Sequence, residues 1–514
     1  MDRVSRRDFL RAGAAGAAGA VALGAGGLEL PDDLAAGAAS TKPPSRHALR
    51  QLQRQLKGRL LLPGDPGYLQ ASTPANGRYR SVRPVAVAEC ADEADVVTCV
   101  NWVRRNGVMP VARGGGHSYA GYSTTTGLMI SMKAINDVKV DTQNATVSCG
   151  GAALNKNFYD VAVNGPLFLP GGTCFGVGVG GLALGGGIGY QTHWAGLTCD
   201  HMLSSRIVTA SGDVLQLSPT ENADLFWACR GGAGGSFGIN TAFEFSLVEK
   251  PETVSWYRFD WRGAEAAEAV LYTFNNLIAK APAALNAVAA ATAVKEEGAE
   301  GPRDAIEVFS RGQYIGPLDE LKDLVQPLID AAGTPLKSEL RPIGFWEVVK
   351  IISTIEPPSH GFGDISRYAV DPLPRSAVTE LVDLVSLSPS RDNDNNGSIW
   401  SLGWVGGSVV DKYARTDMAY VHRGVSTLMR PTTVWDDDAD PSVGRDLNDW
   451  TNAVIDVLNP YTPNESYQNF PNRMISDWQQ AYYAENFPRL VEVKTKYDPG
   501  NLFQNAQSIP VAAS

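Results

Sequence analysis

The spacing of apolar and polar residues divides the chain into two regions of different character. Up to residue 250, short apolar runs alternate with glycine-rich turns, a pattern typical of short strands and short helices. From residue 251 to about residue 460, glycine becomes sparse and long helical patterns alternate with strand patterns. This second region predicts an antiparallel sheet with helices over one face. The chain as a whole therefore predicts an α+β fold.

Several predicted elements have recognisable start and stop residues. Residues 92–106 have apolar residues at helical spacing and are followed by Gly107, which favours a helix that stops there. A helix over 222–230 is expected to begin with a polar cap, and Ser211-Gly212-Asp213 predicts a hairpin turn. The other predicted helices are 45–57, 154–162, 265–281, 318–332 and 477–497, and the predicted strands are 83–87, 108–112, 128–132, 137–141, 145–149, 206–209, 214–217, 239–248, 254–259, 305–310 and 398–403.

Residues 170–190 stand out because ten of these twenty-one residues are glycine. A flexible linker is one interpretation. Small aliphatic side chains between the glycines favour another, a buried backbone held close to a flat polar group such as the pyrophosphate of a dinucleotide. Upstream, the predicted strand 108–112 leads into Arg113-Gly114-Gly115-Gly116-His117-Ser118, which has the layout of a phosphate-cradling turn.

Composition excludes several classes of partner. The chain has 514 residues, a net charge of -11 and a pI near 5.2, and it lacks the basic face that binding of a nucleic acid requires. Its six cysteines show no spacing typical of a metal site, so we expect no metal and mostly buried thiols. Cys174, inside the glycine stretch, is the expected exception. The expected partner is a small molecule.

The first 39 residues are interpreted as an export signal. Ser5-Arg6-Arg7-Asp8-Phe9-Leu10 is a twin-arginine signature, and an uncharged run rich in alanine and glycine follows it. A membrane-spanning helix is the alternative, but the run from Ala12 to Leu28 is short and weakly hydrophobic, so we expect no stable membrane insertion. Because the twin-arginine route carries folded proteins, the expectation is an exported, cofactor-loaded enzyme, extracellular or in the cell envelope.

Several motifs together resemble the berberine-bridge-enzyme-like group of the vanillyl-alcohol-oxidase, or PCMH-type, flavoprotein superfamily. They are PVARGGGHSYAGYS, GGTCFGVGVGGLALGGGIGY, ENADLFWACRGGAGGSFGI, and the closing YQNFPNRM with NFPRLVEVKTKYDPGNLFQNAQSIP. The resemblance implies a PCMH-type FAD-binding domain built from both chain ends, residues 46–250 and 461–514. Residues 251–460 would be inserted between them as a substrate domain.

The resemblance also implies a flavin held by two covalent bonds. The His117 imidazole would bond to the 8α carbon and the Cys174 thiolate to C6, and both side chains are nucleophiles suited to an electron-poor ring. The alternatives are a structural loop histidine and a buried, inert thiol. The other expected cofactor contacts are Arg113, Gly114, Gly115, Gly116, Ser118, Val177, Gly178, Gly181, Gly187, Gly189, Tyr467 and Asn469.

The implied reaction is oxidation of an alcohol to a carbonyl, with hydride transfer to flavin N5 and reduction of O2 to H2O2. Tyr467 is the candidate base, and Asn469 would position it or contact the flavin; core packing is the alternative for Tyr467. A phenol with an ordinary pKa of about 10 needs a neighbour that lowers this pKa, and the sequence does not identify one. Tyr368, Trp404 and His422 are candidates for the ring-facing side of the substrate domain, with core or surface packing as the alternative.

A few positions determine how far the resemblance extends. Val177, three residues after Cys174, lines the oxygen-side pocket in the resembling family and is small enough to admit O2, which favours an oxidase over a dehydrogenase. Leu182 stands where many relatives have a histidine, and Phe470-Pro471-Asn472 replaces the commoner Tyr-x-Asp. These departures weaken the transfer of active-site details but leave the covalent attachment untouched.

The substrate class stays open between a sugar and a secondary metabolite. The same scaffold with another base would suit a ring-forming reaction at carbon or nitrogen, or amine oxidation. An extracellular flavoprotein that sequesters a toxic small molecule is a third hypothesis. We expect a monomer or a homodimer.

Overall fold

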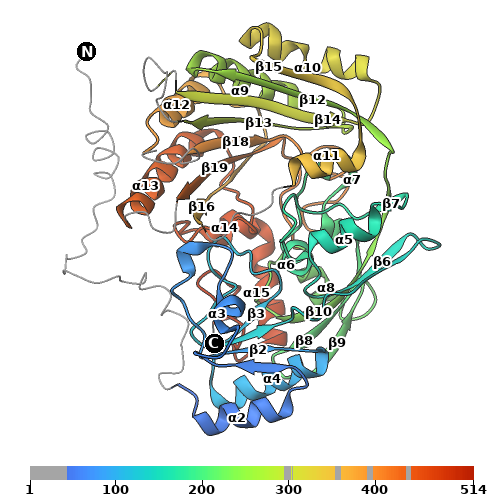
Figure 1. Ribbon diagram of the computed structural model, residues 1–514, viewed down its shortest axis with the longest axis vertical. Coiled ribbons are helices and arrows are strands. Elements are labelled where there is room, and N and C mark those ends of the chain that lie inside the picture. Colours follow the sequence, from blue (N-terminus) through green and yellow to red (C-terminus); the bar gives the residue numbers. More distant parts are fainter. Residues whose placement is uncertain are drawn as a thin grey trace.

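The computed structural model describes residues 43–294, 303, 305–353, 360–389, 397–435 and 441–513 (Figure 1). The predicted export signal, residues 1–39, lies outside them. The first and last parts of the described chain share one half of the molecule, and the middle part forms the other half (Figure 1). None of the described helices is long and apolar enough to cross a membrane.

A four-stranded sheet carries the turn that leads to His117. Its order is β1 (Arg59–Leu61), β2 (Ala86–Glu89), β4 (Leu128–Ser131) and β3 (Pro110–Arg113), and the last three are parallel. Helices α2 (Arg46–Gln55) and α4 (Glu93–Asn106) pack against this sheet in one core cluster. As predicted, α4 ends at Gly107, which has a left-handed backbone. Strand β2 starts three residues later than predicted, beyond Pro84, which has no N–H to donate to a sheet.

A five-stranded antiparallel sheet follows. Its order is β5 (Val138–Asp141), β6 (Thr146–Gly150), β10 (Gly238–Ser246), β8 (Met202–Thr209) and β9 (Val214–Leu217), and β8 and β9 form the predicted hairpin. The prediction that a polar residue caps the start of helix α8 (Ala223–Ala228) is wrong, because the Asn222 side chain precedes the helix without capping it. The Asn222 amide donates to the Gln216 carbonyl oxygen at 2.8 Å and accepts no hydrogen bond from the helix.

The remaining short elements of this half lie between or after the strands of these two sheets along the chain. They are α3 (Tyr68–Ser72), α5 (Asn155–Ala162), α6 (Val179–Leu184), α7 (Thr192–Ala195), 3₁₀ turns at Gly77–Tyr79 and Thr198–His201, and the strand pair β7 (Leu167–Phe168) and β11 (Val248–Glu249).

The middle of the chain forms an antiparallel sheet covered by helices, as the sequence predicts. Helices α9 (Ala264–Ile278), α10 (Leu318–Ala332) and α12 (Arg375–Ser386) pack on its outer face (Figure 1). Helices α11 (Phe345–Ile352) and α13 (Pro441–Leu458) lie at its edges, followed by a 3₁₀ turn at Asn459–Tyr461. The strands, in sheet order, are β15 (Lys337–Gly344), β12 (Thr253–Arg262), β14 (Ile306–Tyr314), β13 (Leu285–Ala293), β18 (Ser398–Leu402), β19 (Thr427–Trp435) and β16 (Gly361–Asp364), with β17 (Arg367–Ala369) also paired to β19.

The C-terminal tail returns to the N-terminal half (Figure 1). The prediction of one helix over 477–497 is wrong, because the segment is divided into α14 (Trp478–Tyr483), a 3₁₀ turn at Ala484–Asn486, and α15 (Phe487–Tyr497). Ala484 has a φ of 41°, and Pro488 has no N–H with which to continue the helical hydrogen bonds across this point. The break places α15 against α8.

Candidate active site

The turn that carries His117 lies directly against the glycine stretch that carries Cys174. A Cβ atom on Gly115 would lie 2.5 Å from the Gly178 backbone nitrogen, so the two segments touch backbone to backbone. This contact requires glycine on both sides, since a side chain on either would collide with main chain. His117 and Cys174 are both half-buried. The fold therefore brings into contact the segments that carry His117 and Cys174, two residues that lie 57 positions apart in the chain.

The side chain of Arg113 is bound by the protein itself. Its guanidinium donates to the carbonyl oxygens of Ser123, Ala71, Ser72 and Thr73 at 2.8 to 3.3 Å, and burial lowers the pKa of Arg113 to about 10. Any contact with a cofactor would therefore come from its backbone.

Ser118 also has a local role in the same turn. Its hydroxyl accepts a hydrogen bond from the Tyr122 N–H at 3.0 Å.

Cys174 differs from every other cysteine. All six cysteines lie in the described part of the chain, and the other five are buried. The start of α5 holds the Cys174 turn in place, because the Asn155 side-chain amide donates to the Cys174 carbonyl oxygen at 2.9 Å and the Asn155 N–H donates to the Val177 carbonyl oxygen at 3.0 Å. The fixed backbone leaves a partly exposed thiol, with Val177 half-buried three residues later.

The glycines of the stretch fall into two groups. Gly187 and Gly189 pack against the chain itself, because a Cβ atom would lie 2.4 Å from the Thr198 hydroxyl oxygen and 1.8 Å from the Gly171 carbonyl oxygen respectively. Gly181, on the exposed side of α6, has no atom of the described residues within 4 Å of a Cβ position. Gly114, in the His117 turn, has only ordinary contacts from 3.6 Å. Open space for a cofactor is thus confined to a few of the predicted positions.

The phenol oxygen of Tyr467 meets three N–H donors. The backbone N–H groups of Gly187 and Ile188 donate to it at 3.0 and 3.1 Å, and the Asn469 side-chain amide donates at 3.1 Å. Burial raises the pKa of Tyr467 to about 12, and the three donors act in the opposite direction because they stabilise the phenolate. The tail thus places Tyr467 on the glycine stretch. Sequence reasoning required a neighbour that lowers the pKa of Tyr467, and these donors offset only part of the rise that burial causes.

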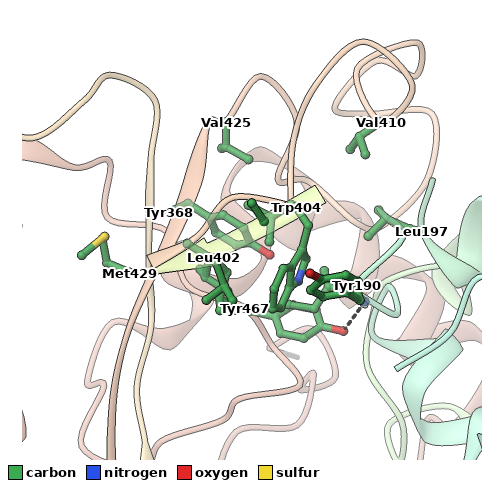
Figure 2. Close-up of a cluster of buried hydrophobic side chains, with 14 of the residues drawn as sticks. Tyr190, Leu197, Tyr368, Leu402, Trp404, Val410, Val425, Met429 and Tyr467 are labelled. Atoms are coloured by element: carbon green, nitrogen blue, oxygen red, sulfur yellow. Dashed lines mark hydrogen bonds between the residues drawn. The ribbon is translucent and has the colours of Figure 1, made fainter. Parts of the chain in front are cut away.

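Tyr368 and Trp404 lie in the core close to Tyr467 (Figure 2), and His422 is fully buried. The Tyr368 hydroxyl is 2.8 Å from that of Tyr420, and the Tyr368 ring stacks on His422 with centroids 4.4 Å apart. Burial lowers the pKa of His422, which indicates a neutral ring. Core packing is thus the interpretation that their burial supports.

Two functional candidates were missed at the sequence level. The buried Asp364 and the half-buried Arg430 form an ion pair beside the His117 turn, and the Arg430 guanidinium donates to the Tyr119 hydroxyl at 3.1 Å. Both residues belong to strands of the middle sheet and carry no motif, so no local pattern signals their position.

The donor set fits a flavin dinucleotide better than a metal. An imidazole and a partly exposed thiol lie on adjacent segments, with open glycine backbone nearby, and both groups can bond to an electrophilic ring. Within the described ranges, no cluster of histidine, cysteine, aspartate and glutamate could hold a metal ion. The residues that would hold the cofactor are therefore those of the His117 turn and of the glycine stretch.

Comparison with known proteins also indicates a protein that binds FAD. A family model described as "FAD binding domain" matches residues 84–218, and one described as "Berberine and berberine like" matches residues 466–510. The chain is 31% identical over 469 residues to the uncharacterized FAD-linked oxidoreductase YgaK of Bacillus subtilis, covering 89% of this chain and 97% of that protein. It is 29% identical to glucooligosaccharide oxidase of Sarocladium strictum, covering 84% of this chain and 88% of that one.

Solved structures agree at the level of the fold. The structure of a chitooligosaccharide oxidase superposes with a TM-score of 0.79 at 27% identity, covering 91% of this chain and 100% of that one. Berberine bridge enzyme from Eschscholzia californica superposes with the same TM-score at 21% identity, covering 91% and 99% of the two chains.

Proposed function

The chain belongs to the berberine-bridge-enzyme-like FAD-dependent oxidoreductases, and from this premise we propose that it oxidises an alcohol group of a carbohydrate or secondary metabolite to a carbonyl, with O2 as the electron acceptor. The names of two relatives, glucooligosaccharide oxidase and chitooligosaccharide oxidase, support a carbohydrate alcohol. Val177, half-buried beside the Cys174 turn, supports access of O2. When bound, FAD would accept the hydride and pass the electrons to oxygen.

We propose that His117 and Cys174 hold the flavin covalently. The support is their adjacency through the Gly115 and Gly178 contact and the exposure of Cys174 among otherwise buried thiols. The proposed FAD-binding unit comprises residues 46–250 and 461–514, and residues 251–460 cover it as the substrate unit. Acid-precipitated protein should remain yellow, and the His117→Ala/Cys174→Ala double variant should release all of its flavin.

The observation that carries the proposed reaction is the set of three N–H donors on the Tyr467 oxygen. A phenolate can accept several hydrogen bonds, and these donors offset part of the rise in pKa that burial causes. Tyr467 would take the hydroxyl proton of the substrate while the hydride leaves from the adjacent carbon. The Asn469 side chain is the donor most able to yield its place to the substrate hydroxyl, because the other two are fixed backbone groups.

The decisive experiment is an anaerobic screen of candidate alcohols against the purified holoenzyme. Loss of the oxidised flavin absorbance indicates turnover, whereas a spectral shift without bleaching indicates binding alone and favours a sequestering protein. Product analysis by NMR separates the alternatives among enzymes, because alcohol oxidation forms a carbonyl, whereas ring closure removes the same two hydrogens without forming one. Tyr467→Phe is the matched control, and it should bind the substrate with little bleaching.

We also propose that residues 1–39 direct export by the twin-arginine route to the envelope or the medium. Replacing Arg6 and Arg7 by lysine should retain the enzyme inside the cell. Export at parental levels in that variant would contradict the assignment.

A further inference from the structure

Arg311 lies on the face of the middle sheet that is turned toward the N-terminal half. Helices α9, α10 and α12 pack on the opposite face. The direction of the first face follows from Asn286 of β13, whose side-chain oxygen accepts a hydrogen bond from the Trp194 N–H of α7 at 3.3 Å. Gln313 of β14 lies directly opposite Asn286. Arg311, two residues earlier in β14, therefore shares this face.

The register of the sheet connects Arg311 to the cluster around Tyr467. Arg311 lies opposite Val288 of β13, and Val288 lies opposite Leu402 of β18. Leu402 and Tyr467 belong to one cluster of buried side chains (Figure 2). Because Arg311 is two strands away from Leu402, their backbones lie about 10 Å apart across the sheet. Arg311 is thus placed to meet a part of the substrate remote from the proposed base.

The positive charge of Arg311 has no counter-ion in the described part of the chain. No carboxylate there lies within ion-pair distance of its guanidinium, and its Nε is buried without a hydrogen-bond partner. Arg258, directly opposite on β12, is paired instead, because its Nε donates to both carboxylate oxygens of Asp260 at 2.9 and 3.1 Å. Burial lowers the pKa of Arg311. A half-buried charge without a partner is costly, so an anion from outside the chain would be well received here.

Unpartnered amide groups adjoin Arg311 toward the buried end of β14. The Gln313 side chain is fully buried, and neither its amide oxygen nor its amide nitrogen has a hydrogen-bond partner among the described residues. The Asn286 amide nitrogen is also buried and unpartnered, while its oxygen is held by α7. Buried polar groups are nearly always satisfied in native proteins. Two such amides next to an unpaired guanidinium therefore indicate a site for a ligand with hydrogen-bonding groups.

Toward the other end of β14, the same face opens to solvent. Gln313 is buried, Arg311 and Phe309 are half-buried, and Glu307 is exposed. The Phe309 ring lies 5.2 Å from the Arg311 guanidinium and packs edge to face against the half-buried Trp400 ring, with centroids 5.3 Å apart. Aromatic surface with a few polar groups is typical of small-molecule sites. The face thus offers apolar surface for a sugar ring beside a cation.

We propose that this face binds the remote part of the substrate, where Arg311 pairs with a carboxylate and the Gln313 and Asn286 amides provide further hydrogen bonds. The inference rests on the proposed function and deepens it, because it selects an acidic carbohydrate with a uronic acid beyond the ring that is oxidised. The guanidinium fork matches a carboxylate in shape. A single negative charge also suits a chain of net charge -11 better than the two charges of a phosphate. Arg311 would determine specificity without touching the reacting atoms.

The test compares disaccharides that differ only in the carboxylate. Cellobiose and cellobiouronic acid are the first pair, since they share the reducing-end glucose and the second has a carboxylate in place of the outer primary alcohol. Pairs with galactose or N-acetylglucosamine at the reducing end follow. Each is mixed anaerobically with the holoenzyme, and flavin reduction is measured against substrate concentration. The parent should show a kcat/KM about ten- to hundredfold higher for the acidic member, the effect of one hydrogen bond to a charged group.

The variants separate binding from catalysis. Arg311→Gln should raise KM for the acidic member by about ten- to hundredfold and leave its kcat unchanged, because a remote contact binds substrate and transition state alike. Kinetics with the neutral member should not change, and Arg311→Lys should retain part of the preference.

Arg341→Gln is the matched control. Arg341 lies on the same face of β15, two strands from β14, and its removal changes the net charge by the same amount. Its guanidinium is already occupied, because it donates to Glu339 and Glu347 at 2.8 and 3.0 Å. The variant should therefore keep the preference for the acidic member.

Several results would overturn the inference. One is equal kcat/KM for both members of a pair that bleaches the flavin, which leaves the proposed function intact. Others are a preference that Arg311→Gln keeps or Arg341→Gln also loses, and bleaching only by alcohols that are not carbohydrates.

Two further outcomes have their own measurement. If no alcohol bleaches the flavin, the proposed function fails, and calorimetric titration with cellobiouronic acid decides the inference: binding that Arg311→Gln loses supports it, whereas no binding or unchanged binding overturns it. Should Arg311→Gln fail to load FAD, the parent is assayed at low and high NaCl. A preference that falls with salt supports an ion pair, and one independent of salt overturns the inference.

Discussion

Removal of the Asn469 amide should move the pH dependence of substrate oxidation in a defined direction. Tyr467 must lose its proton to act as a base, and its pKa is raised to about 12. Below that pH the reactive fraction grows tenfold for each pH unit, so kcat/KM should rise with pH through the neutral and alkaline range. Asn469→Leu keeps a side chain of similar size but removes one of three donors to the phenolate.

The size of the effect follows from the hydrogen bond that is lost. A hydrogen bond to a charged group contributes about 1.5 to 3 kcal/mol, and one pKa unit corresponds to about 1.4 kcal/mol. The pKa of Tyr467 should therefore rise by roughly one to two units. Because a phenolate of higher pKa is also a stronger base, part of the loss is recovered. We therefore expect kcat/KM at a fixed neutral pH to fall by about three- to thirtyfold.

The assay is anaerobic stopped-flow reduction of the flavin by a substrate from the screen, repeated from neutral to alkaline pH. The expected result is a rising limb that shifts to higher pH in Asn469→Leu and disappears in Tyr467→Phe. The reasoning is refuted if Tyr467→Phe keeps the limb, or if Asn469→Leu changes KM alone and leaves the limb in place. Flavin absorbance before mixing verifies that both variants are loaded.

Other predictions concern stability and the glycine stretch. Against the effect of burial, hydrogen bonds from His422 and Arg415 hold the pKa of Glu465 at about 2 instead of 4.5. About 3 kcal/mol of stability should therefore be present above pH 4.5 and lost as the pH falls toward 2. Urea unfolding against pH should show this loss, and Glu465→Gln should flatten it. Lys494→Met leaves the fully buried Asp498 carboxylate unpaired and should cost about 3 to 5 kcal/mol in chemical unfolding; an unchanged midpoint would contradict this. Gly187→Ala, with a φ of 88° and a colliding Cβ, should lose roughly 3 kcal/mol in the same assay, whereas Gly181→Ala should unfold as the parent does.

Elements whose ends are encoded locally could be predicted from the sequence. Helix α4 begins after Asp92, whose side chain accepts from the Asp95 N–H, and it ends at Gly107, so both boundaries are written in the residues at its ends. Helix α10 occupies the predicted range 318–332. The tail was mispredicted because its apolar periodicity continues through Ala484, while the backbone does not.

The turns that carry the site were also accessible from sequence, but the pairing of distant side chains was not. His117 and Cys174 belong to recognisable glycine-rich motifs. The Arg430–Asp364 pair depends instead on the register of β16 and β19, in which Asp364 lies opposite Thr432. Such a register is set by the sheet as a whole and leaves no mark in a short window of residues.

The sequence and the structure give different reasons for the many glycines of residues 170–190. The glycine-rich composition predicted a backbone held close to the pyrophosphate of a dinucleotide. The structure indicates that much of the close contact is with the chain itself, as at Gly187 and Gly189. A cofactor alone would therefore account for too few of the glycines. Packing of the stretch against the His117 turn and under Tyr467 fixes where Cys174 lies, and the same backbone supplies two N–H donors to the Tyr467 oxygen. The stretch therefore joins the proposed attachment residue to the proposed base through one rigid segment, so a change in its packing should alter both.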